Sequence, residues 1–295
     1  MTTSTFAGKG TATQPASAPR RRRPISGRTA GRAAALIAAT FLTLGPVVWT
    51  VLTSMRPPSE SLGSGGSVLS GGLDFSSYGE VFRQVNMWLL IWNSALVTGL
   101  VAIGQMASAA LAGYVFARID FKGRGILFTI LLATMMVPLQ VTIVPVFMLI
   151  RGMGLSDTLL ALILPAIPTA FGTFLMRQYF LGLPGELAEA AAIDGASPFR
   201  TFRSVYVPLA WPGLAIVGIL AFNYHWNEFF RPLIMTISEQ NFTLPLGLVS
   251  LQGNMGTGSV ATVLAGVVIS MIPALLVFLF GQRYLREGLT AGANK

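Results

Sequence analysis

Six long apolar runs limit what this chain can fold into. They cover residues 33–55, 89–117, 125–150, 158–175, 207–224 and 258–280. The hydrocarbon core of a bilayer is about 30 Å thick, so a helix needs about 20 apolar residues to cross it. Because 53% of the 295 residues are hydrophobic and 11% are charged, a water-soluble fold would leave large apolar patches exposed. We therefore predict an all-α, polytopic membrane protein with six transmembrane helices.

Several of these runs contain prolines. Among them are Pro138 and Pro145 in 125–150 and Pro165 and Pro168 in 158–175. Inside a membrane, neighbouring helices can satisfy the carbonyl groups that a proline leaves free, so we expect kinks within the spans.

The ends of the chain are polar. Residues 1–32 have no helical or strand periodicity and contain a run of four arginines, which predicts a disordered basic tail. The apolar run that follows is longer than the 7–15 residues of a signal-peptide core, and Arg56-Pro57-Pro58 after it is no cleavage site. We predict an uncleaved first span, a membrane domain over 33–281 with a polar loop at 176–206, and a polar tail over 282–295.

Lysine and arginine placement predicts the orientation, because these residues collect on the cytoplasmic side. With six spans and the N-terminus inside, 16 of the 20 basic residues fall on the cytoplasmic side. The four on the other side are Arg56, Arg83, Arg151 and Arg231. Both termini and the 176–206 loop are therefore expected in the cytoplasm. The net charge of +9 is then a topology signal, and we predict no nucleic-acid binding.

Composition also excludes several kinds of chemistry. The chain has no cysteine and one histidine, His225, which excludes disulfides, thiolate sites and multi-histidine metal clusters. It contains no Gly-x-x-x-x-Gly-Lys-[Ser/Thr] loop for ATP and no Ser/His/Asp or paired-carboxylate arrangement in a membrane-side pocket. We predict that the chain is not an enzyme and binds no metal or cofactor of its own.

The polar stretch 186–208 contains signals for two short helices. Glu186 begins the first, which is expected to end at Asp194, and Gly195 suits a left-handed helix end. Ser197-Pro198 is a cap followed by proline at the first helical position, and Pro208 is expected to end the second helix. The residues alone leave two interpretations open. The stretch is either an amphipathic hairpin on lipid headgroups or a surface that docks another protein.

A motif in this stretch resembles that of a known family. The motif consists of Glu189-Ala190-Ala191, three residues, Gly195, nine residues and Val205-Tyr206-Val207-Pro208. It resembles the EAA motif of ABC-importer permeases. That motif reads E-A-A, three residues, G, nine residues, I-x-L-P, so only two apolar positions differ. Flanking stretches, among them Asn93-Ser94 and Trp226-Asn227-Glu228-Phe229, are similar to the MalG-type permeases of carbohydrate uptake over about residues 74–295.

The resemblance implies a type I ABC-importer permease fold in a bacterial cytoplasmic membrane. The implied partners are a second permease subunit in a heterodimer, a cytoplasmic ATPase dimer that binds ATP and Mg, and an extracytoplasmic solute-binding protein. The hairpin would place a helix in a cleft of the ATPase, where Glu189 would pair with a basic residue. The implied ATPase-coupling residues are Glu189, Ala190, Ala191, Asp194, Gly195, Ser197, Pro198, Phe199, Arg200 and Pro208.

Polar and aromatic side chains in or near the spans are candidates for a solute pathway. They are Asn93, Gln105, Gln140, Asn223, Tyr224, Trp226, Asn227 and Glu228. Aromatic rings can stack on a sugar and amides can hydrogen-bond its hydroxyl groups. The same residues also fit other roles, since polar groups hold membrane helices together and aromatic residues collect at interfaces. Glu228 and Arg231 are expected to pair with each other.

Three alternatives remain beside an ATP-driven sugar importer. A secondary carrier or channel would need buried ionisable groups or an inverted repeat, and the spans contain essentially no charge. A membrane scaffold would have a docking loop and no pore. An importer of the same kind could also carry a polyol or glycerophosphodiester. The solute is not identified by these residues, because such assemblies share selectivity with the partner permease and the binding protein.

Overall fold

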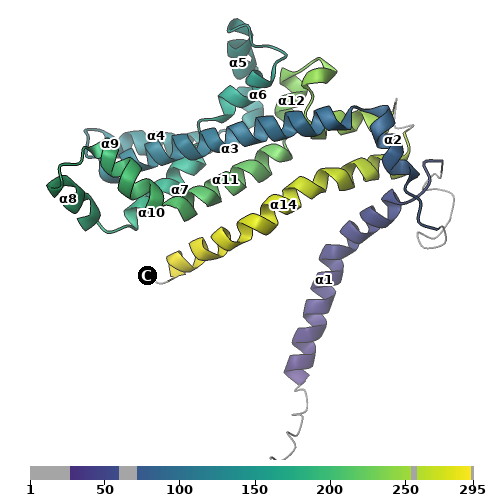
Figure 1. Ribbon diagram of the computed structural model, residues 1–295, viewed down its shortest axis with the longest axis horizontal. Coiled ribbons are helices and arrows are strands. Elements are labelled where there is room, and N and C mark those ends of the chain that lie inside the picture. Colours follow the sequence, from purple (N-terminus) through teal and green to yellow (C-terminus); the bar gives the residue numbers. More distant parts are fainter. Residues whose placement is uncertain (1–26, 60–71, 254–257, 294–295) are drawn as a thin grey trace, which may run out of the picture. The chain divides into compact units, whose positions relative to one another are not determined.

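A computed structural model describes residues 27–59, 72–253 and 258–293 (Figure 1). This part of the chain is helical and contains no strand, which confirms the predicted all-α fold class. The α-helices are α1 (Gly27–Ser54), α2 (Ser76–Gln84), α3 (Met87–Arg118), α4 (Arg124–Thr134), α5 (Leu139–Gly152), α6 (Leu159–Ile163), α7 (Ala170–Leu181), α8 (Glu186–Ile193), α9 (Pro198–Thr201), α10 (Val207–Leu209), α11 (Trp211–Trp226), α12 (Phe230–Met235), α13 (Leu244–Gly247) and α14 (Val260–Ala293).

The chain divides into two units, Met1–Val48 and Trp49–Lys295. Most of α1 belongs to the first unit, and its segment Gly31–Ser54 is long and apolar enough to cross a bilayer. α1 begins at Gly27, so the end of the predicted 1–32 tail is helical. The rest of that predicted tail lies outside the described residues.

The predicted spans correspond to single helices or to bent pairs of helices. α1, α3 and the Val260–Tyr284 part of α14 are single helices that pass as spans. Three pairs pass together and are bent by 101° (α4 and α5), 40° (Leu159–Ala166 and α7) and 75° (Pro198–Leu209 and α11). The described chain therefore has three helices long and apolar enough to cross a bilayer, or up to six such segments if each bent pair is one span.

The bend between α4 and α5 is sharper than the kink expected at Pro138. Pro138 has an extended backbone, with ψ of 142°, and precedes the first residue of α5. A proline lacks the N–H that would continue α4 and disfavours helical geometry at the residue before it. α4 and α5 have 11 and 14 residues, so each is shorter than the roughly 30 Å that a span must cover.

The segment 225–257, which lies between the last two apolar runs, is folded into the helical bundle in its described part. It contains α12, α13 and two 3-10 turns, and Met235, Leu244 and Leu251 are buried. α3 holds this segment by polar contacts. Asn93 Nδ2 donates to the carbonyls of Gln240 and Phe242 (2.8 and 3.0 Å), and the Leu244 N–H donates to Ser94 Oγ (2.6 Å). Because these contacts join residues about 150 positions apart, local sequence signals did not indicate them.

Small residues let α3 lie directly against α7. Ala109 of α3 and Gly172 of α7 are buried at this contact, together with Gly113. A Cβ atom on Gly113 would lie 2.7 Å from Met176 Cβ and 2.9 Å from the backbone nitrogen of Arg177. Small residues at such contacts are typical of membrane helices, which associate through close van der Waals contact and not through exclusion of water.

We predict that Gly113→Ala destabilises the protein and that Gly99→Ala does not. Both glycines lie in α3, but a Cβ on Gly99 would have no atom within 4 Å. Alanine favours a helix by about 1 kcal/mol over glycine, whereas overpacking against a backbone costs about 1–3 kcal/mol. Thermal unfolding of the purified protein in detergent should show a lower midpoint for Gly113→Ala only. Equal midpoints for the two variants would contradict the close contact of α3 with α7.

Candidate functional site

The segment Glu186–Leu209, called the hairpin below, lies at the end of the bundle where α3 ends (Figure 1). Its first helix is α8, as predicted, with Glu186 and Glu189 in the first turn, where the helix dipole favours acidic side chains. The predicted polar loop 176–206 starts later in the structure, because α7 continues to Leu181.

Gly195 ends α8 in the predicted left-handed conformation, with φ of +74°. Its N–H donates to the Ala192 carbonyl (3.0 Å), and the Ala196 N–H donates to the Ala191 carbonyl (2.9 Å). This pair of hydrogen bonds is the Schellman arrangement, which satisfies the last carbonyls of a helix and needs a residue that tolerates positive φ.

The predicted cap of the second helix is confirmed, and its predicted end at Pro208 lies one residue before the observed end. Ser197 Oγ accepts a hydrogen bond from the Arg200 N–H (3.3 Å), with Pro198 at the first helical position. Pro208 does not end the helix, which continues to Leu209. The turn before it, Phe202–Tyr206, is a π-helix in which the Val207 N–H donates to the Phe202 carbonyl. The wider turn changes the backbone register just before the proline, which has no N–H to donate.

Aromatic rings attach the hairpin to the bundle. Tyr206 and Phe202 of the hairpin, Tyr114 of α3 and Phe180 of α7 are all buried. The Tyr114 ring centroid lies 5.0 Å from that of Phe202, 5.2 Å from that of Tyr206 and 5.9 Å from that of Phe180. The Tyr114 hydroxyl donates to the Pro198 carbonyl (3.3 Å). The hairpin is therefore fixed to both α3 and α7.

Arg118, at the last position of α3, closes the base of the hairpin. Its Nη2 donates to the carbonyls of Phe180 (2.6 Å) and Leu183, after which the chain enters the hairpin. The guanidinium also lies over the Tyr206 ring, 5.2 Å from the centroid, at a distance typical of a cation–π contact. Sequence reasoning used Arg118 only to assign orientation and did not find this role.

The outer surface of the hairpin is exposed. Ile193 is 87% exposed and Phe199 is 65% exposed. Of the residues predicted to couple to an ATPase, Ala191 is buried, and the others are exposed: Glu189, Ala190, Asp194, Gly195, Ser197, Pro198, Phe199, Arg200 and Pro208. Glu189 forms no ion pair with any described residue. The hairpin thus combines a fixed base with a free surface.

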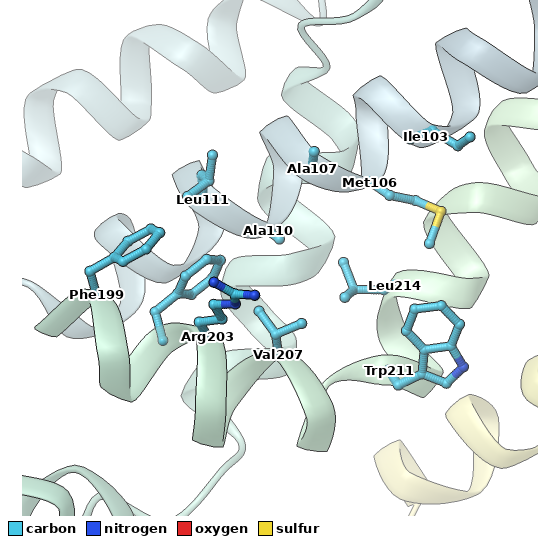
Figure 2. Close-up of a pocket in the computed structure, with 11 residues that line it drawn as sticks. Ile103, Met106, Ala107, Ala110, Leu111, Phe199, Arg203, Val207, Trp211 and Leu214 are labelled. Carbon is cyan, nitrogen blue, oxygen red and sulfur yellow. The ribbon is translucent and has the colours of Figure 1, made fainter. Parts of the chain in front are cut away.

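An apolar groove separates the hairpin from one face of α3 (Figure 2). Its volume is about 580 Å³. Ile103, Ala107 and Leu111 of α3 lie along one side, and Phe199 and Val207 of the hairpin lie along the other. Arg203 is the one charged residue of the lining and the others are apolar, so the groove suits an acyl chain or an apolar helix better than a polar solute.

A second cavity, of about 550 Å³, is lined by both polar and apolar groups of α3, α7, α11 and α12 and of the 165–169 segment. Gln105, near the middle of α3, donates from Nε2 to the Ala166 carbonyl (2.8 Å) and lies 3.0 Å from His225 Nε2. His225 Nδ1 lies 2.7 Å from Glu228 Oε2, and Glu228 Oε1 lies 3.0 Å from Arg231 Nη2. The predicted pairing of Glu228 with Arg231 is confirmed.

The eight candidate pathway residues do not form one site. Gln105, Asn223 and Tyr224 line the second cavity, and Glu228 is linked to it through His225 and Arg231. Asn93 and Trp226 are buried, and each donates to backbone carbonyls. Asn93 donates to Gln240 and Phe242, and Trp226 donates to Ser270 (3.0 Å). Gln140 and Asn227 are exposed and do not line the cavity.

Asp157 is a polar anchor that the sequence reading missed. Its backbone has φ of +55°, which aspartate tolerates better than most residues. Its carboxylate accepts from Ser238 Oγ (2.5 Å) and from the N–H groups of Ile237 (2.9 Å) and Ser238 (3.0 Å). These hydrogen bonds hold the pKa of the Asp157 carboxyl well below its usual range. Asp157 therefore joins the turn after α5 to the segment after α12.

Comparisons with known proteins agree on one kind of membrane protein. Residues 109–289 match the family described as "Binding-protein-dependent transport system inner membrane component". The arabinooligosaccharides transport system permease protein AraQ of Bacillus subtilis is 36% identical, with 87% of this chain and 92% of that protein covered. The sn-glycerol-3-phosphate transport system permease protein UgpE of Brucella abortus is 31% identical, with 86% and 93% covered. A chain in the crystal structure of a bacterial ABC transporter that imports the acidic polysaccharide alginate has a TM-score of 0.76, 25% identity and coverage of 90% and 99%.

We predict that Gly195→Ala loosens α8 and that Gly185→Ala does not. A side chain at positive φ costs about 1–2 kcal/mol, whereas Gly185 has φ of −67° and open space for a Cβ, with only Arg118 Nη1 nearby at 3.9 Å. Hydrogen exchange should become faster for the amides of α8 and Ala196 in Gly195→Ala. Equal protection of α8 in the two variants would contradict the role of Gly195 as the helix end.

Proposed function

The chain belongs to the family of binding-protein-dependent transport system inner membrane components, and from this premise we propose that it works as the transmembrane permease subunit of an ATP-driven importer of a sugar or oligosaccharide. Family membership and the helical spans place it among multi-pass membrane proteins of ABC importers. The proposal adds the energy source, the docking surface and the solute. The observation that carries it is the hairpin, which is exposed on its outer surface and fixed at its base.

The hairpin is suited to dock a cytoplasmic ATPase. Glu189 is exposed and free of ion pairs among the described residues, and the thin surface at Ala190 lets another protein approach the backbone closely. Ile193 and Phe199 add exposed apolar contacts. We expect Glu189 to pair with a basic residue of the ATPase, with the hairpin on the cytoplasmic side as the positive-inside rule predicts.

Movement of the docked hairpin would be transmitted to the spans. The aromatic contacts of Tyr114 and Tyr206 and the hydrogen bonds of Arg118 fix the hairpin to α3 and α7, so these elements move together. The proposed mechanism is a rigid-body change. Closure of the ATPase dimer draws the hairpins of the two permease subunits together, and the spans then open the solute path to the other side.

ATP and Mg belong to the partner in this proposal. The sequence has no phosphate-binding glycine loop, and the described residues contain no group of three acidic, histidine or cysteine side chains that could hold a metal. The chain's own contribution is to bind, orient and conduct the solute. The remaining proposed partners are a second permease and an extracytoplasmic solute-binding protein.

Relatives support a carbohydrate or a related polyol as the solute. AraQ is named for arabinooligosaccharides and UgpE for sn-glycerol 3-phosphate, and the structurally similar transporter is named for alginate. These solutes share many hydroxyl groups but differ in charge, so the relatives support a hydroxyl-rich solute and do not select among them.

We predict that Glu189→Ala abolishes coupled transport and that Glu186→Ala has little effect. Both glutamates are exposed in the first turn of α8, but only Glu189 belongs to the motif. Removing one partner of a desolvated ion pair costs about 2–5 kcal/mol, which corresponds to a loss of at least about 30-fold. Solute uptake and binding-protein-stimulated ATP hydrolysis should be measured with the complete importer in proteoliposomes.

Membrane insertion serves as the control, since Glu189→Ala should reach the membrane in normal amounts. Normal uptake by Glu189→Ala would remove the docking role of the hairpin. Transport by this chain without an ATPase would overturn the proposed function itself.

A further inference from the structure

In the cavity lined by Gln105 and His225, the directions of the hydrogen bonds determine whether His225 is charged. A glutamine NH₂ group can only donate, and that of Gln105 contacts both the Ala166 carbonyl and His225 Nε2. His225 Nε2 is therefore the acceptor, and the ring proton lies on Nδ1, 2.7 Å from Glu228 Oε2. This assignment makes His225 a neutral side chain that donates to the Glu228 carboxylate.

Both charged groups at the cavity are paired. Glu228 and Arg231 form an ion pair of 3.0 Å, in which each side chain is about nine-tenths buried. Arg231 Nη1 also donates to the Leu162 carbonyl (3.1 Å). Among the described residues that line the cavity, Arg231 is the only lysine or arginine, and the Glu228 carboxylate neutralises its charge. The cavity therefore offers no uncompensated positive charge.

Neutral polar groups of the cavity are still free to bind. The amide oxygen of Gln105 and the side-chain amide of Asn223 make no hydrogen bond to a described residue. Tyr224 is 57% exposed, and its ring meets that of His225 edge to face with centroids 5.0 Å apart. Amides that can donate and accept suit hydroxyl groups, which do both, and an aromatic ring suits the apolar face of a sugar.

We propose that this cavity is a solute site within the permease itself, and that it accepts neutral saccharide units and rejects sugar phosphates and uronates. Its volume of about 550 Å³ lies in the range of small-molecule sites, about 300–1,000 Å³. An anion that enters loses its hydration and meets no free cation, whereas a hydroxyl-rich neutral ring replaces water with hydrogen bonds from Asn223 and Gln105. The inference rests on the proposed importer function and adds the charge class of the solute.

The solutes that accumulate inside proteoliposomes test whether the importer selects neutral over anionic solutes. The complete importer, with its binding protein outside and ATP available to the ATPase, is given one mixture of probes. The neutral probes are mono-, di- and trisaccharides of arabinose, galactose and glucose. The anionic probes are the matching uronates and sugar phosphates and sn-glycerol 3-phosphate. Mass spectrometry of the vesicle contents should find neutral saccharides alone. Uptake of any anionic probe would overturn this inference and leave the importer function standing, whereas ATP-dependent uptake of no probe would count against the importer function.

Asn223→Ala and Asn227→Ala test the location of the site. Both asparagines lie at the end of α11 and are exposed, but only Asn223 lines the cavity. With saturating binding protein and the neutral saccharide found above, uptake by Asn223→Ala should fall about five- to tenfold, the effect of one lost hydrogen bond to solute. Asn227→Ala removes only a hydrogen bond from Asn227 Nδ2 to the Asn223 backbone carbonyl (2.8 Å) and should transport normally. ATP hydrolysis stimulated by the binding protein should stay unchanged in both variants, which separates solute contact from a folding or docking defect. Normal uptake by Asn223→Ala would overturn the site.

Discussion

The close contact of α3 with α7 is the constraint on which the rest of the structure depends. Gly113 has no room for a Cβ at this contact, and a Cβ on Gly172 would lie 3.1 Å from Ala109 Cβ of α3, so the two helices can approach only through small residues. Lipid gives membrane helices no hydrophobic reason to associate, and their contact must come from van der Waals packing and hydrogen bonds. Both the base of the hairpin and the polar cavity lie along these same helices. A loss of the contact would therefore disturb both.

α3 provides a rigid connection between the hairpin and the cavity. Gln105 lines the cavity, whereas Tyr114 and Arg118 hold the hairpin, so about 14–20 Å of one continuous helix separates the two sites. α11 makes a second connection, from Trp211 next to α10 to His225 at the cavity. In the proposed mechanism, displacement of the docked hairpin reaches the solute site through two helices. Neither connection requires a flexible segment to transmit movement.

Local signals in the sequence predicted the hairpin well and the cavity poorly. Ser197, Pro198 and Gly195 determine their own backbone geometry, so the cap and the left-handed turn were visible without a structure. The pairing of Glu228 with Arg231 was also visible at short spacing. The burial of Arg231 was not, because its backbone partner Leu162 is 69 positions away. The continuation of the helix through Pro208 depended on a π-turn, for which the sequence gives no clear signal.

A single-cysteine cross-linking experiment tests the central claim that the hairpin is the ATPase-docking surface. The chain has no cysteine, so one can be placed at Ile193 on the hairpin or at Ile237, both highly exposed. Ile237 lies beside Asp157 and the segment bound by Asn93, at the opposite end of α3 from Arg118. A thiol-anchored photo-cross-linker at Ile193→Cys should link the chain to the ATPase subunit in the complete importer, and the same reagent at Ile237→Cys should not. Cross-linking of the ATPase from Ile237→Cys, or none from Ile193→Cys in an actively transporting complex, would contradict the account.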